Sequence, residues 1–410
     1  SGRVRSDEIA RKLRIENFVC QIHGTNKILS YQYLAGLVVR AIDRFCQTAD
    51  PVPCGDHVPF VNGLDDIDVV DGKAVSKWGP NQAALRRHVE PYLLAAWADL
   101  QRPAGTLRFS HNHYLKIWQL SKPDIYADII LYDEAQDANG CMLDIVNSQR
   151  NSQLIFVGDT YQQIYEWNGA VNALAQADPT APRTHLTESF RFGPGIALFA
   201  NKALEWLGAT IELKGRSLEP QFVGPIAEPN AHLFRTNAKA VAETMRVLKA
   251  GGKPALVGGA QEVVNFAKAA EELKAGRRTQ HPELICFDTW GEVQHYVEFD
   301  PSGTELKSLV DLVDDYGADV IIEALDKRVD EKGADVVIST AHKSKGREWD
   351  SVKLAGDFPD PNERDLTQED VRLLYVAATR AKRQLDPTQV GFFDFQRGAS
   401  DDTGQSRVGD

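Results

Sequence analysis

The sequence predicts an α/β fold built on open parallel sheets. Two apolar runs of strand length, residues 129–132 (IILY) and 154–157 (LIFV), end abruptly in carboxylates, and a helical segment separates them. Asp133 and Glu134 follow the first run, and Asp159 follows the second. Because ligands bind at the carboxyl ends of the strands in such sheets, we expect these three side chains to lie along one rim of an active site.

The composition is that of an ordinary globular protein. With 410 residues, of which 43% are hydrophobic and 25% charged, the chain is long enough to bury two cores. It has no apolar run of bilayer-spanning length. Five cysteines are scattered without a CxxC pair, which argues against structural zinc and a disulfide framework and favours a cytoplasmic or nuclear protein. A net charge of −12 weighs against coating duplex DNA by charge alone.

The carboxylates suit nucleotide hydrolysis. That reaction needs one carboxylate to hold Mg²⁺ and another to orient and deprotonate the attacking water, and Asp133 and Glu134 can divide these roles. Gln162, beyond the neighbouring strand, is placed to sense a γ-phosphate. An apolar run that ends in Asp-Glu can also be an ordinary strand boundary. The longer string DEAQD, followed after a short helix by GDTYQQIYEWNGA, favours the functional interpretation.

These strings carry a resemblance to a known family. DEAQD and GDTYQQIYEWNGA resemble motifs II and III of the UvrD/Rep-type superfamily 1 DNA helicases. HNHYLKIWQLSKP from His111, IFVGDTYQQIYEWNGAVNAL from Ile155 and LTESFRFG from Leu186 are similar to strings of the F-box DNA helicase branch. The resemblance implies two RecA-like P-loop NTPase domains with ATP and Mg²⁺ as cofactors, acting on single-stranded DNA and DNA junctions. Asp133 would then be the Mg²⁺ ligand, Glu134 the base and Gln162 the sensor.

The resemblance also implies a domain organisation. Apolar spacing of the helical kind over residues 28–46 and 82–100 fits a helical subdomain of the type called 1B. The expected parts are a 1B-like subdomain (1–107), RecA-like domain 1A with motifs II to IV (108–227), RecA-like domain 2A with motifs V and VI (228–397), a reduced 2B-like insertion within it (about 240–334) and a disordered tail (398–410).

Two arginines are assigned to the nucleotide by resemblance. Residues 184–192 (THLTESFRF) are expected to form a third strand of domain 1A that ends in motif IV, where Phe190 stacks on adenine and Arg191 reaches the γ-phosphate. A planar guanidinium suits that task because it meets two phosphate oxygens together. Arg380 lies in LLYVAATRAK, which resembles motif VI on a helix, and is expected to be the second γ-phosphate arginine. Without these motifs, both arginines would be interpreted as ordinary surface or ion-paired residues.

Motif V supplies residues for both ligands. Residues 335–340 (DVVIST) are expected to form a buried strand that runs into AHKSKGREW. By resemblance, Thr340 and His342 face DNA, while Gly346 and Glu348 face the nucleotide together with Asp159. Further resemblance-based DNA contacts are Tyr165 and Trp167, whose ring would stack on a base. Trp290 and its aromatic neighbours are interpreted as core residues instead.

A phosphate-binding loop is missing from the sequence. No GxxxxGK[ST] pattern occurs in the 410 residues. Residues 18–29 (FVCQIHGTNKIL) come nearest, but they hold one glycine, and Ile28 follows Lys27 where a hydroxyl is needed for Mg²⁺. We therefore expect a helix–loop–helix there rather than a degenerate phosphate loop. Since the family carries its loop before the 1B region, the resemblance implies a truncated form whose first RecA-like domain is N-terminally incomplete.

Two functions stay open at this stage. The first is an ATP-dependent DNA helicase or translocase, of 3′-to-5′ polarity by resemblance, that serves recombination or repair. The alternative is a non-hydrolysing DNA-binding or regulatory helicase-like module. Two departures from the family pattern bear on both: Asn168 occupies a position that is usually arginine, and Arg347 occupies one that is usually apolar.

Overall fold

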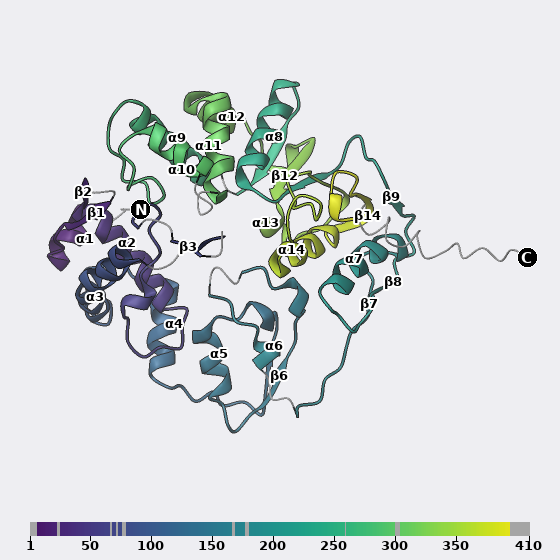
Figure 1. Ribbon diagram of the computed structural model, residues 1–410. Coiled ribbons are helices and arrows are strands. Elements are labelled where there is room, and N and C mark those ends of the chain that lie inside the picture. Colours follow the sequence, from purple (N-terminus) through teal and green to yellow (C-terminus); the bar gives the residue numbers. More distant parts are fainter. Residues whose placement is uncertain are drawn as a thin grey trace, which may run out of the picture. The chain divides into compact units, whose positions relative to one another are not determined.

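The structure is a computed structural model with two compact units, each described separately below (Figure 1). Unit 1 comprises Ser1–Asp159, Tyr165–Ala177 and Lys268–Val310, and unit 2 comprises Thr160–Ile164, Asp178–Ala267 and Asp311–Asp410. The described residues are 6–22, 25–65, 68–70, 73–75, 79–165, 169–176, 180–258, 260–299 and 304–393. The tail expected to be disordered lies outside them, as do Trp167 and Asn168. No helix in these ranges combines the length and apolar character needed to cross a membrane.

Three helices contribute most residues of one hydrophobic core of unit 1. They are α1 (Ser6–Leu13), α2 (Tyr31–Phe45) and α3 (Pro80–Leu100). The Ser30 hydroxyl caps α2 by accepting the Tyr33 N–H at 3.2 Å, and the helix buries one apolar face against α3. Both predicted helices of this region are thereby confirmed. The second continues past Pro91 without ending.

Residues 18–22 and 25–29 form two paired strands, so the expected helix–loop–helix is wrong. Strand β1 (Phe18–Ile22) pairs antiparallel with β2 (Thr25–Leu29). The reason is the strict alternation of buried and exposed side chains along β1, which has the period of a strand. Lys27, the lysine of the rejected phosphate loop, pairs with Asp288 instead. Strand β3 (Asp68–Val70) likewise pairs antiparallel with β4 (Lys73–Val75).

The DEAQD region of unit 1 forms the predicted strand–helix–strand. Strand β5 (Ile129–Tyr132) pairs in parallel with β6 (Gln153–Phe156), and α5 (Gly140–Asn147) connects them. Helix α4 (His111–Leu120) precedes β5, and α6 (Ala173–Gln176) follows β6. One face of the pair is open: Leu131 is 70% exposed and Ile129 54%.

The third strand expected in this sheet is wrong in extent and in partner. Only β7 (Glu188–Ser189) forms within 184–192, and it pairs in parallel with β8 (Lys214–Gly215) inside unit 2. A two-residue strand offers few ladder hydrogen bonds, and the apolar Leu186 within this segment is 88% exposed. The boundary of domain 1A therefore stays a prediction.

The middle of the predicted 2B-like insertion belongs to unit 1. The helices of the insertion are α9 (Ala260–Lys274), α10 (Trp290–Phe299), α11 (Thr304–Tyr316) and α12 (Ala318–Asp326). Residues 268–310 join unit 1 through contacts such as Asn62 Nδ2 to Glu283 Oε2 and Lys27 to Asp288. Trp290 is 6% exposed, which confirms its interpretation as a core residue.

Unit 2 holds a parallel sheet of six described strands. Their order is β11-β12-β10-β13-β14-β9, and every neighbouring pair is parallel. The strands are β9 (Phe222–Val223), β10 (Ala231–Phe234), β11 (Pro254–Val257), β12 (Val336–Thr340), β13 (Trp349–Leu354) and β14 (Ala381–Asp386). The predicted strand before motif V is thus confirmed as β12. Parallel strands joined by helical crossovers are the α/β architecture predicted from the sequence.

Helices pack around this sheet in pairs. Helix α8 (Asn237–Lys249) packs beside α12, and α7 (Pro194–Trp206) packs beside α14 (Gln368–Ala378) (Figure 1). The short α13 (Ala341–Ser344) starts directly after β12. Helix α14 begins with a reciprocal cap, because the Thr367 hydroxyl and the Asp370 carboxylate each accept the other's backbone N–H. The motif V and motif VI segments therefore lie on well-formed elements of one unit.

Candidate functional site

The carboxylates of unit 1 lie where the sequence predicted them. Asp133 and Glu134 follow the carboxyl end of β5 and are exposed to solvent. Asp133 Oδ1 accepts the Glu134 N–H at 3.0 Å. Glu134 has φ of 52° and ψ of 41°, a left-handed conformation that is uncommon for a residue with a side chain. Such backbone conformations cluster at functional sites, which fits the predicted role of Glu134 as base.

Gln136 holds this end of the sheet together, and sequence reasoning missed it. Its side chain is fully buried, donates from Nε2 to Glu134 Oε2 and accepts the Asp159 N–H at Oε1, 3.0 Å away. It therefore connects the residues that follow β5 and β6. Gly158 permits this approach, because a Cβ there would lie 2.2 Å from Gln136 Oε1. The only signal in the sequence was its position inside DEAQD.

Asp133 fits a Mg²⁺ ligand. Magnesium prefers oxygen donors and is often held by one or two carboxylates together with water and substrate phosphates. Asp133 offers an exposed carboxylate at the end of a parallel strand, and a single backbone N–H bond orients it. The resemblance-based assignment is compatible with this geometry and stays a prediction.

Unit 2 brings together nucleotide residues that are far apart in the sequence. Arg191 Nε donates to Glu348 Oε2 at 2.9 Å, although 157 positions separate the two residues. A second guanidinium nitrogen of Arg191 donates to the Thr379 carbonyl at 3.3 Å, next to Arg380. Motifs IV, V and VI, inferred separately from the sequence, therefore meet at one place in this unit.

Arg380 has a different setting from the one predicted. It follows the C-cap of α14 instead of lying on the helix, so its placement on a helix is wrong. The reason is that the chain turns at Thr379 directly into β14. Arg380 is 2% exposed, and its guanidinium donates to the Val376 carbonyl at 2.8 Å and to Thr379 Oγ1 at 3.0 Å. To reach a phosphate, it would have to exchange these internal bonds.

Gln162, Gly346 and Phe190, which were also assigned to the nucleotide, lie on short loops of the same unit. Gln162 ends the 3₁₀ turn η3 (Thr160–Gln162), and its carbonyl accepts a hydrogen bond from Lys345 Nζ at 2.8 Å. Gly346 has φ of +77°, where a glycine is favoured. Arg347, the departure in motif V, forms an ion pair with Glu331. Phe190 is 78% exposed, which leaves its ring accessible for the predicted stacking on adenine.

The predicted DNA residues have mixed settings. Tyr165 is half-buried, and burial together with Asp137 raises its pKa. Thr340 is buried, and its hydroxyl caps α13 by accepting the Lys343 N–H at 3.4 Å. Burial lowers the pKa of His342, as do the nearby charges of Arg235 and Lys343. Their contacts with DNA stay predictions, as does that of Trp167 outside the described residues.

Comparison with known proteins agrees with this geometry. Residues 236–387 match the UvrD-like helicase C-terminal domain, and residues 120–180 match the UvrD/REP helicase N-terminal domain. The N-terminal match contains Asp133, Glu134 and Gln162, and the C-terminal match contains Glu348 and Arg380. The chain belongs to the UvrD-like superfamily 1 DNA helicases, which confirms the resemblance inferred from its motifs.

Within that class, the chain is similar to F-box DNA helicases. It is 32% identical over 310 residues to F-box DNA helicase protein 1 of Schizosaccharomyces pombe, a match that covers 66% of this chain and 35% of the relative. It is 28% identical over 412 residues to F-box DNA helicase 1 of Gallus gallus, covering 85% of this chain and 37% of the relative. A shorter match, 34% over 83 residues, covers 18% of this chain and 12% of the probable DNA helicase II homolog of Mycoplasma genitalium. The chain thus spans about a third of the length of the two F-box relatives.

Proposed function

We propose that this chain is the motor part of an ATP-dependent translocase that moves 3′-to-5′ on single-stranded DNA and opens DNA junctions in recombination or repair. The observation that carries the proposal is the bond from Arg191 to Glu348 beside Thr379 and Arg380. An arginine fixed by a carboxylate, with a second arginine next to it, is suited to the charge of a transferring phosphoryl group. The names of the F-box relatives support DNA as the substrate.

Unit 1 contributes the hydrolytic carboxylates in this proposal. Asp133 would hold Mg²⁺, which when bound neutralises charge on the phosphates. Glu134 would orient the attacking water and take its proton, and Gln136 would hold the Glu134 carboxylate in position. In unit 2, Gln162 would sense the γ-phosphate, and the exposed ring of Phe190 would stack on adenine.

The proposal includes a phosphate-binding loop supplied by further polypeptide. The 410 residues contain no GxxxxGK[ST], and an open apolar face on β5, 70% exposed at Leu131, supports additional protein cover there. We expect the 410 residues alone to show little DNA-stimulated ATP hydrolysis, measured by phosphate release with and without single-stranded DNA. Robust turnover that Glu134→Gln abolishes would refute this expectation and would require a phosphate site within the sequence given.

A non-hydrolysing DNA-binding or regulatory module is the second candidate. The same lack of GxxxxGK[ST] favours it, together with an Arg380 whose bonds are satisfied internally. The encoding reading frame separates the two functions. An in-frame GxxxxGK[ST] codon run upstream of Ser1 supports the translocase, whereas an in-frame stop codon in that place supports the module.

Replacement of Trp167 tests whether its side chain contributes to the binding of single-stranded DNA. If its ring stacks on a base, Trp167→Ala should weaken binding of a short single-stranded oligonucleotide by about 1–3 kcal/mol. The measurement is fluorescence anisotropy of a labelled oligonucleotide, together with a thermal melt of each variant. Trp118→Ala is the matched control, because Trp118 lies on α4 and is 43% exposed. A lower melting temperature with unchanged DNA affinity would assign Trp167 to the core, where truncation costs roughly 3–5 kcal/mol.

A further inference from the structure

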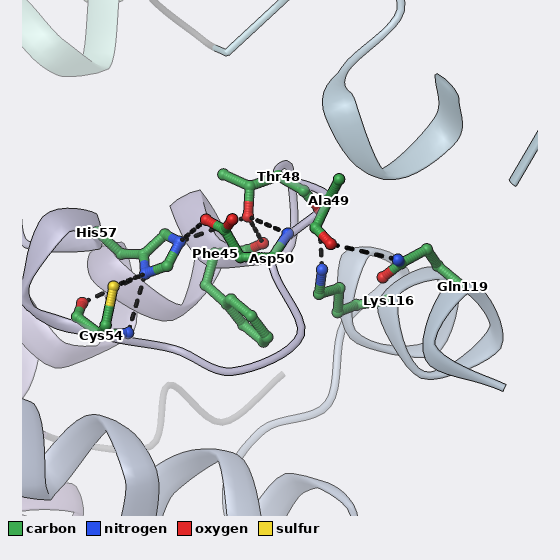
Figure 2. Close-up of polar contacts among 8 residues, drawn as sticks. All are labelled: Phe45, Thr48, Ala49, Asp50, Cys54, His57, Lys116 and Gln119. Atoms are coloured by element: carbon green, nitrogen blue, oxygen red, sulfur yellow. Dashed lines mark hydrogen bonds and ion pairs between the residues drawn. The ribbon is translucent and has the colours of Figure 1, made fainter. Parts of the chain in front are cut away.

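A cysteine, a histidine and an aspartate meet in unit 1 outside every helicase motif. They lie on the loop after α2 and on the 3₁₀ turn η1 (Gly55–His57). Cys54 Sγ lies 3.5 Å from His57 Nδ1, and Asp50 Oδ2 lies 3.0 Å from His57 Nε2. Figure 2 shows the imidazole between the thiol and the carboxylate. A nucleophile, a base and a group that orients the base form the general arrangement of an activated thiol.

One imidazole tautomer suits a base that faces the thiol. His57 Nδ1 lies 3.0 Å from the Cys54 backbone nitrogen and 3.2 Å from the Cys54 carbonyl oxygen, and the Asp50 carboxylate at Nε2 favours the tautomer in which Nδ1 carries the lone pair. The ring hydrogen is then on Nε2, where the Asp50 carboxylate accepts it. The thiol of Cys54 therefore faces a basic nitrogen, and the carboxylate on the far side stabilises the imidazolium that forms when the thiol proton moves.

Neighbouring contacts hold this loop in place. Lys116 Nζ donates to the Thr48 carbonyl at 2.9 Å, and Gln119 Nε2 lies 3.5 Å from the Ala49 carbonyl (Figure 2). The edge of the Phe45 ring packs on His57, with 5.3 Å between ring centroids. His57 is 4% exposed. The imidazole thus lies in a fixed position, as a preorganised site requires.

The charged side chains of α3 leave Asp50 as the charged partner of the imidazole. Arg86 pairs with Asp56 at 2.9 Å, and the Glu90 carboxylate approaches Gly55. These residues carry charges of both signs, and the Asp50 carboxylate contacts the ring itself. The Thr48 hydroxyl, 3.4 Å from His57 Nε2, is the other polar side chain at that nitrogen.

The other four cysteines differ from Cys54. Cys54 is partly exposed, whereas Cys20, Cys46, Cys141 and Cys286 are buried. Burial raises the pKa of all four of these thiols, to about 12 for Cys46 and Cys286. A buried thiol with a raised pKa is a poor nucleophile, because the thiolate is the reactive form. The four buried cysteines therefore serve as internal controls for the reactivity of Cys54.

We propose that Cys54 is a reactive thiol, activated by His57 and Asp50, and a modification site for hydroperoxides and soft carbon electrophiles. With a hydroperoxide, the Cys54 sulfur attacks the terminal oxygen and the O–O bond breaks. The departing alkoxide takes the proton that His57 Nδ1 received from the thiol. The products are a sulfenic acid on Cys54 and an alcohol, so the sulfur is oxidised by two electrons and the peroxide is reduced.

Alkylation of the native 410-residue chain by iodoacetamide tests the proposal. Rates at pH 7 are followed for each cysteine by mass spectrometry of its peptide. We expect Cys54 to react at least about 10-fold faster than each buried cysteine, and His57→Gln to slow Cys54 by about 10-fold or more. Asp56→Asn is the matched control: it changes a carboxylate of the same turn that pairs with Arg86, and it should leave the rate unchanged.

A second comparison must distinguish a Cys54 thiol that is merely exposed from one that His57 activates. A thiol that is exposed but unassisted would react at the same rate in the parent and in a folded His57→Gln variant, so the comparison of these two rates at one pH isolates the contribution of the imidazole. Asp50→Asn, at an exposed side chain, serves if His57→Gln fails to fold by circular dichroism. Hydrogen peroxide followed by dimedone should label Cys54 before the other cysteines. An unchanged Cys54 rate in a folded His57→Gln or Asp50→Asn variant would overturn the proposal.

Discussion

Replacing Lys116 by alanine is expected to lower the free energy of unfolding by roughly 3–5 kcal/mol, because the change opens a cavity and leaves a carbonyl without its donor. The Lys116 side chain is fully buried, donates from Nζ to the Thr48 carbonyl at 2.9 Å and lies over the Phe45 ring, 4.4 Å from its centroid. Urea unfolding followed by circular dichroism measures the loss. Lys239→Ala, at an exposed position of α8, is the control and should stay within about 0.5 kcal/mol of the parent.

Lys116→Met separates packing from charge. Methionine keeps most of the side-chain volume but removes the ammonium, so its cost should be smaller than that of alanine. Burial lowers the pKa of Lys116 below 10.5, which means that the folded state holds this proton less tightly than the unfolded state. Stability of the parent relative to Lys116→Met should therefore rise with pH as it approaches 10.5. Equal unfolding midpoints for the parent and the alanine variant would show that Lys116 contributes nothing to the fold.

The burial of Lys116 shows one limit of sequence reasoning. Lysine is almost never fully buried, so a lysine in HNHYLKIWQL is expected on the surface of its helix. Its burial depends on the Thr48 carbonyl and the Phe45 ring, 68 and 71 positions earlier, which no local pattern reveals. The same holds for Gln136, whose partner Asp159 follows a different strand.

Local sequence patterns predicted secondary structure correctly where residues close in sequence determine it. Strands β5 and β6 were predicted because short apolar runs ended in carboxylates, and both formed with the expected parallel pairing. The pairing of β1 with β2 was not predicted, although the side chains of β1 alternate between buried and exposed as those of a strand do. The segment 184–192 failed for another reason: its pairing with β8 depends on residues that lie beyond it in the sequence.

Motif resemblance assigned to one ligand two residues that no local propensity connects. Arg191 and Glu348 were both assigned to the nucleotide, and they lie 2.9 Å apart. Resemblance placed Arg380 on a helix, which is wrong, because a motif fixes a residue type and not its contacts. Because Arg380 makes hydrogen bonds within unit 2, a substitution that tests its function also changes the stability of the fold.

Arg380→Ala is expected to produce two separable effects. In the 410-residue chain it removes a buried side chain whose guanidinium donates to Val376 and Thr379, and it should cost roughly 2–5 kcal/mol of stability. In a polypeptide that also carries a phosphate-binding loop, ATP turnover should fall by roughly 10³-fold or more, the scale of an arginine finger. Urea unfolding measures the first effect, and DNA-stimulated phosphate release measures the second.

The turnover experiment needs an Arg380 variant that still folds. Arg380→Lys retains the charge and part of the volume, so it should preserve more stability than alanine while losing most turnover, since an ammonium cannot reproduce the planar guanidinium fork. Arg347→Ala is the matched control, because Arg347 is an exposed neighbour paired with Glu331, and its loss should cost no more than about 1 kcal/mol. DNA affinity should stay near that of the parent in all three variants. A folded Arg380→Lys variant with full turnover would show that Arg380 acts on the structure of unit 2 and not on the phosphate.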